Sequence, residues 1–323
     1  MDEASEALVT LVRWKHFRCS LVENESMREN EIEARRSGLY VWDGVIKNKR
    51  VAIVFCLASM VSIQLGVSLS VETLQQFGSF ATTWMRLCFA AAVVLLIARP
   101  DFRSFSKRQW LCSFALGAAM ALMTTCIFEA VLYAPLGLVI SINFLGPIWV
   151  AVIGAANIRM IIWPIVSLAG VVMIAYSGTA WVATVPGVVL ALGAAVGWGS
   201  YILLMKSVGA HFKGLEGLSV SLLFAALILS PMGMSSAHAL GDVDFYTQTA
   251  GLALLVPLLP YILEIQALRV LPSYTFGLMM SLEPAIGALL GFLILSQTLS
   301  VSQIAGGLLV VLSAVGSVKK SNI

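Results

Sequence analysis

The sequence predicts an all-α membrane protein with ten transmembrane helices, arranged as two inverted repeats of five helices each. Three observations indicate this fold class. First, the 323 residues are 59% hydrophobic and 11% charged, with a mean hydropathy of +0.92. Soluble domains carry about 25% charged residues, so the composition excludes an ordinary soluble fold. Second, the apolar residues fall into separate long segments, and third, the two halves of the chain partly repeat each other.

Residues 1–48 are predicted to form a disordered cytoplasmic tail. They are polar, rich in Glu and Arg, and lack a long apolar run. The chain begins with acidic residues, and no basic segment is followed by an apolar one, so we expect no cleavable signal peptide. A basic amphipathic helix over residues 7–22 is the alternative for this tail.

After the tail, apolar segments of the length needed to cross a bilayer follow one another. About 20 apolar residues in a helix span the hydrocarbon core. The segments begin and end where Pro, Gly and charged residues cluster, as in ARPDFRSFSKRQ at 98–109. The predicted spans are Arg50–Val71, Phe80–Ala98, Trp110–Val131, Leu136–Gly154, Ile161–Tyr176, Val185–Ser207, Leu215–Ser235, Thr247–Leu268, Tyr274–Leu295 and Ser300–Ser317.

The basic residues near the ends of the spans all fall on one side of the predicted membrane. Loops on the cytoplasmic side of a membrane carry an excess of Lys and Arg, so this side is predicted to be cytoplasmic. Both termini then lie in the cytoplasm, as an even number of spans requires, and we expect the inner (plasma) membrane. The residues on this side are Lys47, Lys49, Arg50, Arg99, Arg103, Lys107, Arg108, Arg159, Lys206, Lys213, Arg269, Lys319 and Lys320.

An internal repeat relates residues 50–178 to residues 185–318. An odd number of spans per repeat turns the second copy upside down relative to the first. Inverted repeats with helices interrupted by Pro and Gly are typical of secondary transporters, which bind their substrate between the halves. Sliding the chain by 137 residues superimposes Pro135 on Pro272, Pro147 on Pro284, Gly154 on Gly291 and Gly170 on Gly307.

The segment 271–295 is predicted to be a spanning helix that carries a polar site. Its one carboxylate, Glu283, directly precedes Pro284 in an apolar run. A carboxylate in the middle of a bilayer costs roughly 2.5–3.5 kcal/mol, so it should face a cavity or a partner. Pro284 lacks a backbone N–H and leaves a carbonyl one turn earlier unpaired. Gly287 and Gly291 follow on the same helical face and allow a neighbouring helix to approach closely.

Two further charged residues lie inside predicted spans. Arg86 is the basic residue well inside a span. It is predicted to act as a counter-charge for a substrate carboxylate or for Glu283 in the empty state, and a purely structural ion pair is the alternative. Glu264 lies below Pro257 and Pro260, which should break its helix. Proton coupling through Glu283 and Glu264 is predicted, and a fixed pair with a basic group is the alternative for Glu264.

Neutral polar and aromatic residues in the spans complete the predicted substrate-binding set. Singly, such residues more often hold helices together, but in spans related by the repeat they can line one cavity. They are Gln64 and Ser68 in the first span, Asn143 in the fourth, and Trp198 and Tyr201 in the sixth, in addition to Arg86 and Glu283. No cofactor or metal site is predicted, because all three histidines fall outside the spans and the cysteines show no ligand spacing.

The sequence resembles the drug/metabolite transporter superfamily, and within it the EamA-domain exporters of the RhtA threonine/homoserine type. The resemblance covers residues 50–320 and rests on SIQLGVSLS (62–70), TWMRL (83–87), APLGLVISINFLGPIWVAVIG (134–154) and PYILEIQALRVLPSYTFGLMMSLEPAIGALLG (260–291). It implies an inner-membrane exporter of small amino acids with paired EamA repeats. Arg86, Glu264 and Glu283 match positions where such sequences carry the same residue types. Asn143 departs from the pattern, because relatives commonly carry Glu there.

The function predicted from these observations is secondary-active export of small amino acids or related metabolites by alternating access, coupled to protons. The sequence lacks GxxxxGK[ST], which disfavours ATP as the energy source. Efflux of drugs or another metabolite class is the alternative within transport. An intramembrane enzyme is a distant alternative, because no histidine or aspartate lies in a predicted span. The expected partners are a small-molecule substrate and the lipid bilayer, without nucleic acid, for a monomer or homodimer.

Overall fold

The computed structural model describes residues 48–175, 184–234, 241–295 and 300–320, and every regular element in these ranges is a helix. All of them belong to one compact unit, Ile46–Ile323. Apart from Asn48, the predicted tail lies outside the described residues. The elements are α3 (Lys49–Phe77), α4 (Ser79–Ala98), α5 (Lys107–Tyr133), α6 (Leu136–Asn143), α7 (Leu145–Gly154), η1 (Ile158–Met160), α8 (Ile162–Ala175), α9 (Val185–His211), α10 (Glu216–Met234), α11 (Val243–Ala253), η3 (Leu254–Leu258), α12 (Leu259–Val270), α13 (Ser273–Met280), α14 (Glu283–Leu295) and α15 (Val301–Lys320).

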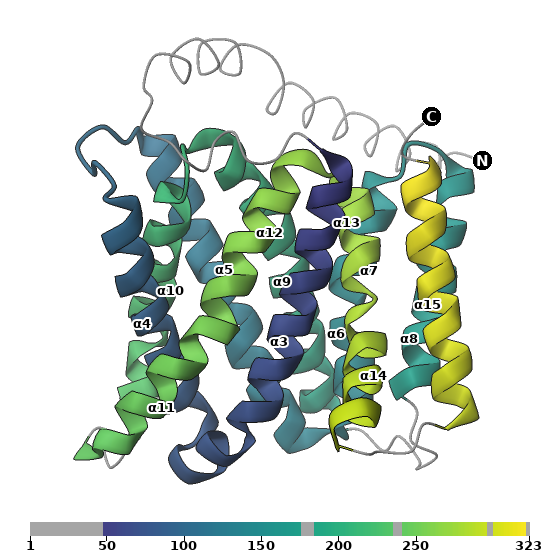
Figure 1. Ribbon diagram of the computed structural model, residues 1–323, viewed down its shortest axis with the longest axis horizontal. Coiled ribbons are helices and arrows are strands. Elements are labelled where there is room, and N and C mark those ends of the chain that lie inside the picture. Colours follow the sequence, from purple (N-terminus) through teal and green to yellow (C-terminus); the bar gives the residue numbers. More distant parts are fainter. Residues whose placement is uncertain (1–47, 176–183, 235–240, 296–299, 321–323) are drawn as a thin grey trace. The chain divides into compact units, whose positions relative to one another are not determined.

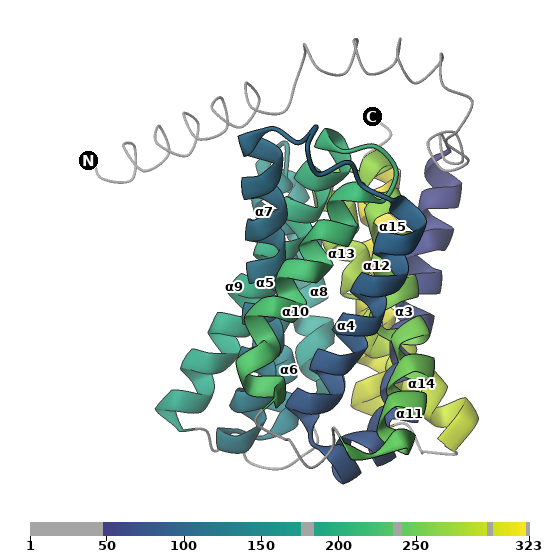
Figure 2. The same ribbon diagram turned by 90° about the vertical axis from the view of Figure 1, so that its left-hand side faces the viewer.

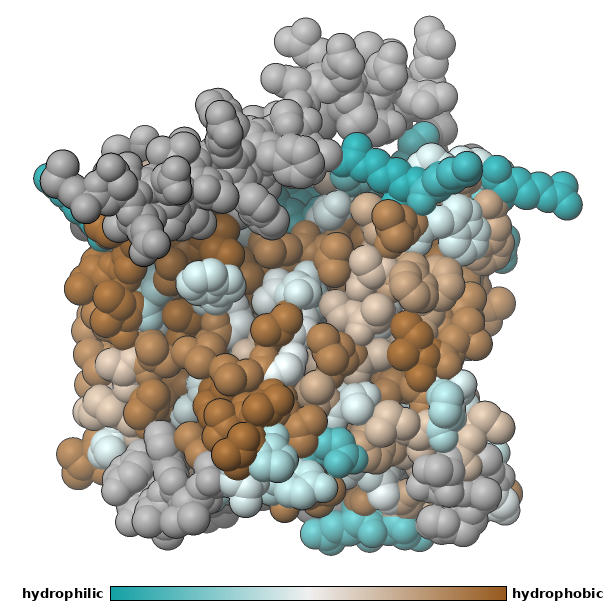
Figure 3. Space-filling model, turned by 180° about the vertical axis from the view of Figure 1, so that it is seen from behind, coloured by the Kyte–Doolittle hydropathy of each residue, from teal (hydrophilic) through white to brown (hydrophobic). Residues whose placement is uncertain are grey.

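Within the described residues, seven helices are long and apolar enough to cross a membrane. Each coincides with one of the predicted spans, so the prediction of an all-helical membrane protein is confirmed. The described part also contains two shorter apolar helices, Leu138–Gly154 and Val301–Gly316. Seen from behind, the helices present a broad hydrophobic surface, as contact with lipid chains requires (Figure 3).

Local sequence signals fix where the helices begin and end. The side chain of Asn48 accepts a hydrogen bond from the Arg50 N–H at 2.9 Å and so caps α3. At the start of α5, Ser106 and Gln109 form a reciprocal capping box. Gly78 adopts φ 83° between α3 and α4, a conformation that glycine adopts without strain. The polar stretch 98–109 therefore separates α4 from α5 where the sequence predicts a break.

Prolines interrupt helices at three places in the described residues. Pro147 and Pro284 lack the N–H that would bond to the carbonyl four residues earlier. The regular helix is accordingly interrupted at Phe144, between α6 and α7, and at Ser281 and Leu282, between α13 and α14, although Phe144 and Ser281 keep right-handed helical φ and ψ. The segment 271–295, predicted as one spanning helix, is thus divided into α13 and α14. The predicted break above Glu264 is confirmed near Pro257, where Val256 has φ −147° and ψ 113°.

The helices pack in pairs that are far apart in the sequence. Figures 1 and 2 show the arrangement, in which α3 lies along α12, α4 along α10, α5 along α9, α7 along α13 and α8 along α15. Buried side chains fill the space between them, the largest including Met60, Leu116, Tyr201, Ile202 and Phe276. This packing brings residues from both halves of the chain to the middle of the unit.

Arg269 holds the turn between α9 and α10 against α12. Its Nε donates to the Gly209 carbonyl at 3.1 Å, and its Nη2 donates to the carbonyls of Phe212 at 3.2 Å and Gly214 at 2.6 Å. The Gly209 carbonyl lies in the last turn of α9, where carbonyls lack partners within the helix, and the other two lie just beyond the end of α9. The end of α12, the helix that carries Glu264, is therefore fixed to α9.

The two interrupted segments touch at Gly277. A Cβ atom on Gly277 would lie 2.5 Å from the Pro147 carbonyl oxygen, whereas one on Gly307 of α15 would have no neighbour closer than 3.9 Å. We therefore expect Gly277→Ala to lower the apparent melting temperature of the purified protein, at a cost of about 1–3 kcal/mol. Gly307→Ala is the matched control and should melt like the wild type. Equal melting temperatures for both variants would contradict the tight α7–α13 contact.

Candidate functional site

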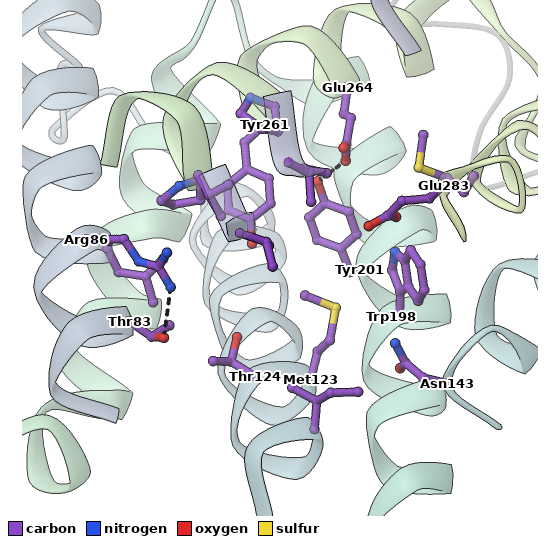
Figure 4. A pocket seen from close by; sticks show the side chains of 18 of the residues that line it. Thr83, Arg86, Met123, Thr124, Asn143, Trp198, Tyr201, Tyr261, Glu264 and Glu283 are labelled. Atoms are coloured by element: carbon purple, nitrogen blue, oxygen red, sulfur yellow. Dashed lines mark hydrogen bonds between the residues drawn. The ribbon is translucent and has the colours of Figure 1, made fainter. Parts of the chain in front are cut away.

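A cavity of about 320 Å³ lies in the middle of the described helices. Its volume falls in the range of small-molecule pockets, which combine apolar walls with a few polar groups. Side chains from both halves of the chain line it (Figure 4). The polar and aromatic lining residues are Thr83, Arg86, Thr124, Phe128, Asn143, Trp198, Tyr201, Tyr261, Glu264 and Glu283.

Arg86 lies on α4 and is 6% exposed. Its Nη1 donates to the Ser70 hydroxyl at 2.9 Å and its Nη2 to the Thr83 hydroxyl at 3.2 Å. Ser70 in turn donates to the Gly66 carbonyl, so its oxygen is available as an acceptor. The Nε atom is buried and has no hydrogen-bond partner. No carboxylate in the described residues is hydrogen-bonded to Arg86, so neither the pairing with Glu283 nor a structural ion pair is present.

Glu264 lies on α12 and is 3% exposed. The Tyr201 hydroxyl on α9 donates to its Oε2 at 2.6 Å. The ring of Tyr261, one turn earlier on α12, packs against the Tyr201 ring with centroids 5.4 Å apart. The hydrogen-bond partners of this acid are therefore hydroxyl groups, the Tyr201 phenol and the Ser59 side chain, whereas the sequence offered a basic group as the structural alternative. Figure 4 shows Glu264 and Tyr201 on the wall opposite Arg86.

Glu283 is the first residue of α14, directly after the interruption. The Nε2 atom of Gln64 lies 3.5 Å from both the Glu283 Oε1 atom and the Glu283 carbonyl oxygen, which is the outer limit of a hydrogen bond. A Cβ atom on Gly287 would lie 2.9 Å from the Gln64 Oε1 atom, so the absence of a side chain there admits Gln64. Gly287 therefore allows the close approach of α3 that the sequence predicts.

The remaining predicted site residues divide between the cavity and the helix surface. Asn143, at the end of α6, and Trp198, on α9, line the cavity. Trp198 packs edge-on against Phe144 with ring centroids 4.8 Å apart. Ser68 is exposed, and its hydroxyl donates to the Gln64 carbonyl of its own helix, so the structure does not bring it to the cavity. Gln64 is not itself a lining residue but contacts Glu283.

Thr83 and Tyr261 also line the cavity, although neither is among the predicted site residues. Thr83 lies three residues before Arg86, and Tyr261 lies three residues before Glu264. Residues three apart share one face of a helix. The three-residue spacing from Arg86 and from Glu264 would therefore have indicated Thr83 and Tyr261. The contributions of Met123 and Thr124 on α5 depend on helix packing, and no local pattern marks them.

Comparison with known proteins places the chain in a family. Residues 185–319 match the EamA-like transporter family. Over 267 residues the chain is 30% identical to the threonine/homoserine exporter RhtA of Escherichia coli K12, a match that covers 82% of this chain and 90% of that protein. The chain belongs to the EamA-like transporter family. The threonine/homoserine exporter RhtA of Salmonella typhimurium LT2 is 31% identical over the same length.

A solved structure supports the fold of this EamA-like transporter. A crystal structure of a protein that is 16% identical aligns with a TM-score of 0.66, covering 81% of this chain and 96% of that one. Together with the apolar helices, the family establishes a multi-pass membrane transporter. The family match includes Trp198, Tyr201, Glu264 and Glu283, and Arg86 lies in the half before it.

Proposed function

We propose that this EamA-like transporter is a secondary-active exporter of small amino acids or related metabolites, resembling threonine and homoserine, in the inner membrane. The identity to threonine/homoserine exporters over most of the chain supports this substrate class. One observation carries the proposal: a single cavity is lined by one cation, Arg86, and by two acids, Glu264 and Glu283. These are the charges that a zwitterionic substrate and a coupled proton require.

The substrate carboxylate binds at Arg86 in this proposal. The unpartnered Nε–H of Arg86 is a donor in a largely desolvated position, and hydrogen bonds between ionised groups are the strong ones. The Thr83 hydroxyl, already bonded to Arg86, limits the rotation of the guanidinium. The substrate ammonium binds at Glu283, whose carboxylate is contacted by Gln64 only at the long distance of 3.5 Å.

The second acid is proposed as the proton site. Glu264 lines the same cavity, but its carboxylate already accepts a short hydrogen bond from Tyr201. This carboxylate is therefore less available to the substrate than that of Glu283. Glu283 takes the ammonium or the coupling proton, and Glu264 takes a proton in the exchange that drives export. In alternating access, the cavity opens to one side of the membrane at a time while both acids remain between the two halves.

The ten-helix inverted repeat is proposed as the frame of this motion, with residues 50–178 and 185–318 as its halves and both termini in the cytoplasm. In this scheme α3, α4, α5, α6–α7 and α8 correspond to α9, α10, α11–α12, α13–α14 and α15. The contacts support it, because the pairing of α5 with α9 has a counterpart in that of α12 with α3. Phe144 and Ser281, 137 residues apart, both have φ −66° and ψ −12° at the interruptions.

Replacing Glu283 by glutamine tests the proposed role of this acid. In liposomes containing the purified protein, we expect counterflow of labelled threonine to fall about tenfold or more, because a neutral amide cannot replace a charge-assisted hydrogen bond to the ammonium. The pH dependence of the remaining counterflow should also weaken. Glu72→Gln, an exposed position on α3, is the matched control and should behave like the wild type. Unchanged, pH-dependent counterflow in Glu283→Gln would remove Glu283 from the mechanism.

A further inference from the structure

Asn143 presents an unsatisfied acceptor to the cavity. It lines the cavity wall, and its side-chain oxygen is buried without any hydrogen-bond partner. Buried polar atoms in folded proteins are almost always paired, so an exception beside a binding cavity points to a group that the cavity receives. Among the cavity-lining residues, Arg86 Nε is the other buried side-chain atom without a partner. Figure 4 shows the two residues on opposite walls.

The position of Asn143 is fixed by close packing of the residues that directly follow it. The next residue, Phe144, is buried and packs edge-on against Trp198. At Gly146, a Cβ atom would lie 2.3 Å from the Ala195 carbonyl oxygen, so α7 begins in direct contact with the α9 backbone. A polar group held in place by packing costs little ordering when a ligand binds. Asn143 is therefore a preorganised group, unlike a surface amide.

The chemistry of the amide selects the kind of group it binds. A side-chain amide has one acceptor oxygen and a donor NH₂, and a hydroxyl can both donate to the oxygen and accept from the nitrogen. A carboxylate has no proton to donate to the unpartnered oxygen, whereas an ammonium has, but in the proposed function the substrate ammonium binds at Glu283. A side-chain hydroxyl is the substrate donor that then remains for the Asn143 oxygen.

We propose that Asn143 binds the side-chain hydroxyl of a hydroxy amino acid and sets the preference of the transporter for hydroxylated substrates. The inference rests on the proposed export of small amino acids, in which Arg86 and Glu283 hold the carboxylate and the ammonium. The side chain of the substrate then needs a third contact, and Asn143 provides it. Relatives commonly carry Glu at this position, and a carboxylate oxygen also accepts from a hydroxyl, so Asn143 keeps that acceptor without adding a charge to the cavity.

The test compares substrates that differ by the hydroxyl alone. Threonine and homoserine both become 2-aminobutyrate when the hydroxyl is replaced by hydrogen. In liposomes containing wild-type protein, we expect threonine or homoserine to compete with labelled threonine in counterflow about tenfold more strongly than 2-aminobutyrate does. A tenfold difference corresponds to about 1.4 kcal/mol of binding free energy. In Asn143→Leu this ratio should fall to about one, because leucine offers no hydrogen bond. Asn143→Ala should give the same ratio and serves if the leucine variant does not fold.

The controls separate this inference from the proposed function. Ser230→Ala, at a hydroxyl that bonds within its own helix, should retain the wild-type ratio. An unchanged ratio in both Asn143 variants, with transport still measurable, would overturn the hydroxyl contact while leaving amino acid export in place. Equal loss for all three substrates would assign Asn143 to general structure and overturn the inference as well. If none of the three competes in the wild type, both the inference and the proposed substrate class are wrong.

Discussion

Replacing Arg86 by glutamine should lower threonine counterflow by about 100-fold and leave the apparent melting temperature unchanged or higher. Losing a charge-assisted contact in a desolvated site costs about 2–5 kcal/mol of binding, which corresponds to a factor of about 30 to several thousand, a range that includes this value. The stability result follows from the surroundings of Arg86. It is 6% exposed and bonded to two neutral hydroxyls, so its charge has no counter-ion among the groups bonded to it. A buried, unpaired charge destabilises the fold, and its removal relieves that cost.

Counterflow in liposomes and thermal unfolding of the same preparations measure the two effects. Arg86→Lys keeps the charge but loses the planar fork of donors, so it should retain part of the activity. Arg99→Gln, at an exposed position after α4, is the control for loss of a positive charge. If Arg86→Gln loses activity and melts at a clearly lower temperature, Arg86 holds the helices together and does not serve the substrate.

The sequence predicted the charged residues of the site because their cost in a membrane marks them. Arg86, Glu264 and Glu283 each lie in an apolar run, where a charge persists only with a partner or a cavity. The structure places all three on one cavity. Ser68 was included on its residue type alone, and its hydroxyl bonds to its own helix. A polar residue that can satisfy itself locally carries no such signal.

The partners of these residues could not be predicted, because they depend on helix packing. Tyr201 and Glu264 are 63 residues apart, and only the contact of α9 with α12 joins them. The sequence offered a basic partner for Glu264, since an ion pair is the usual expectation for a buried acid. The interruption at Ser281 could be predicted only in part. Pro284 indicates that a backbone carbonyl loses its hydrogen bond, but it does not indicate whether the helix bends or stops. Whether the helix bends or stops depends on tertiary contacts, such as that of Gly277 with Pro147.

Replacing Glu264 by glutamine should separate driven export from exchange. The amide oxygen of glutamine can still accept the hydrogen bond from Tyr201, so the wall of the cavity is retained. Glutamine cannot bind and release a proton. We therefore expect threonine uptake driven by an imposed proton gradient to fall about tenfold or more, to the level seen without a gradient. Counterflow, which needs only exchange of bound substrate, should persist at a substantial fraction of the wild-type rate.

A second variant tests whether the pair acts as one unit. Tyr201→Phe leaves the buried Glu264 carboxylate without its 2.6 Å donor, which should cost about 1–3 kcal/mol of stability. Combined with Glu264→Leu, which removes the group that needs the donor, the same change should cost less, so the two effects are not additive. Glu129→Gln, outside the cavity lining, is the control for both assays. Gradient-driven uptake that survives in Glu264→Gln would exclude Glu264 as the proton site, because the neutral side chain has no proton to exchange.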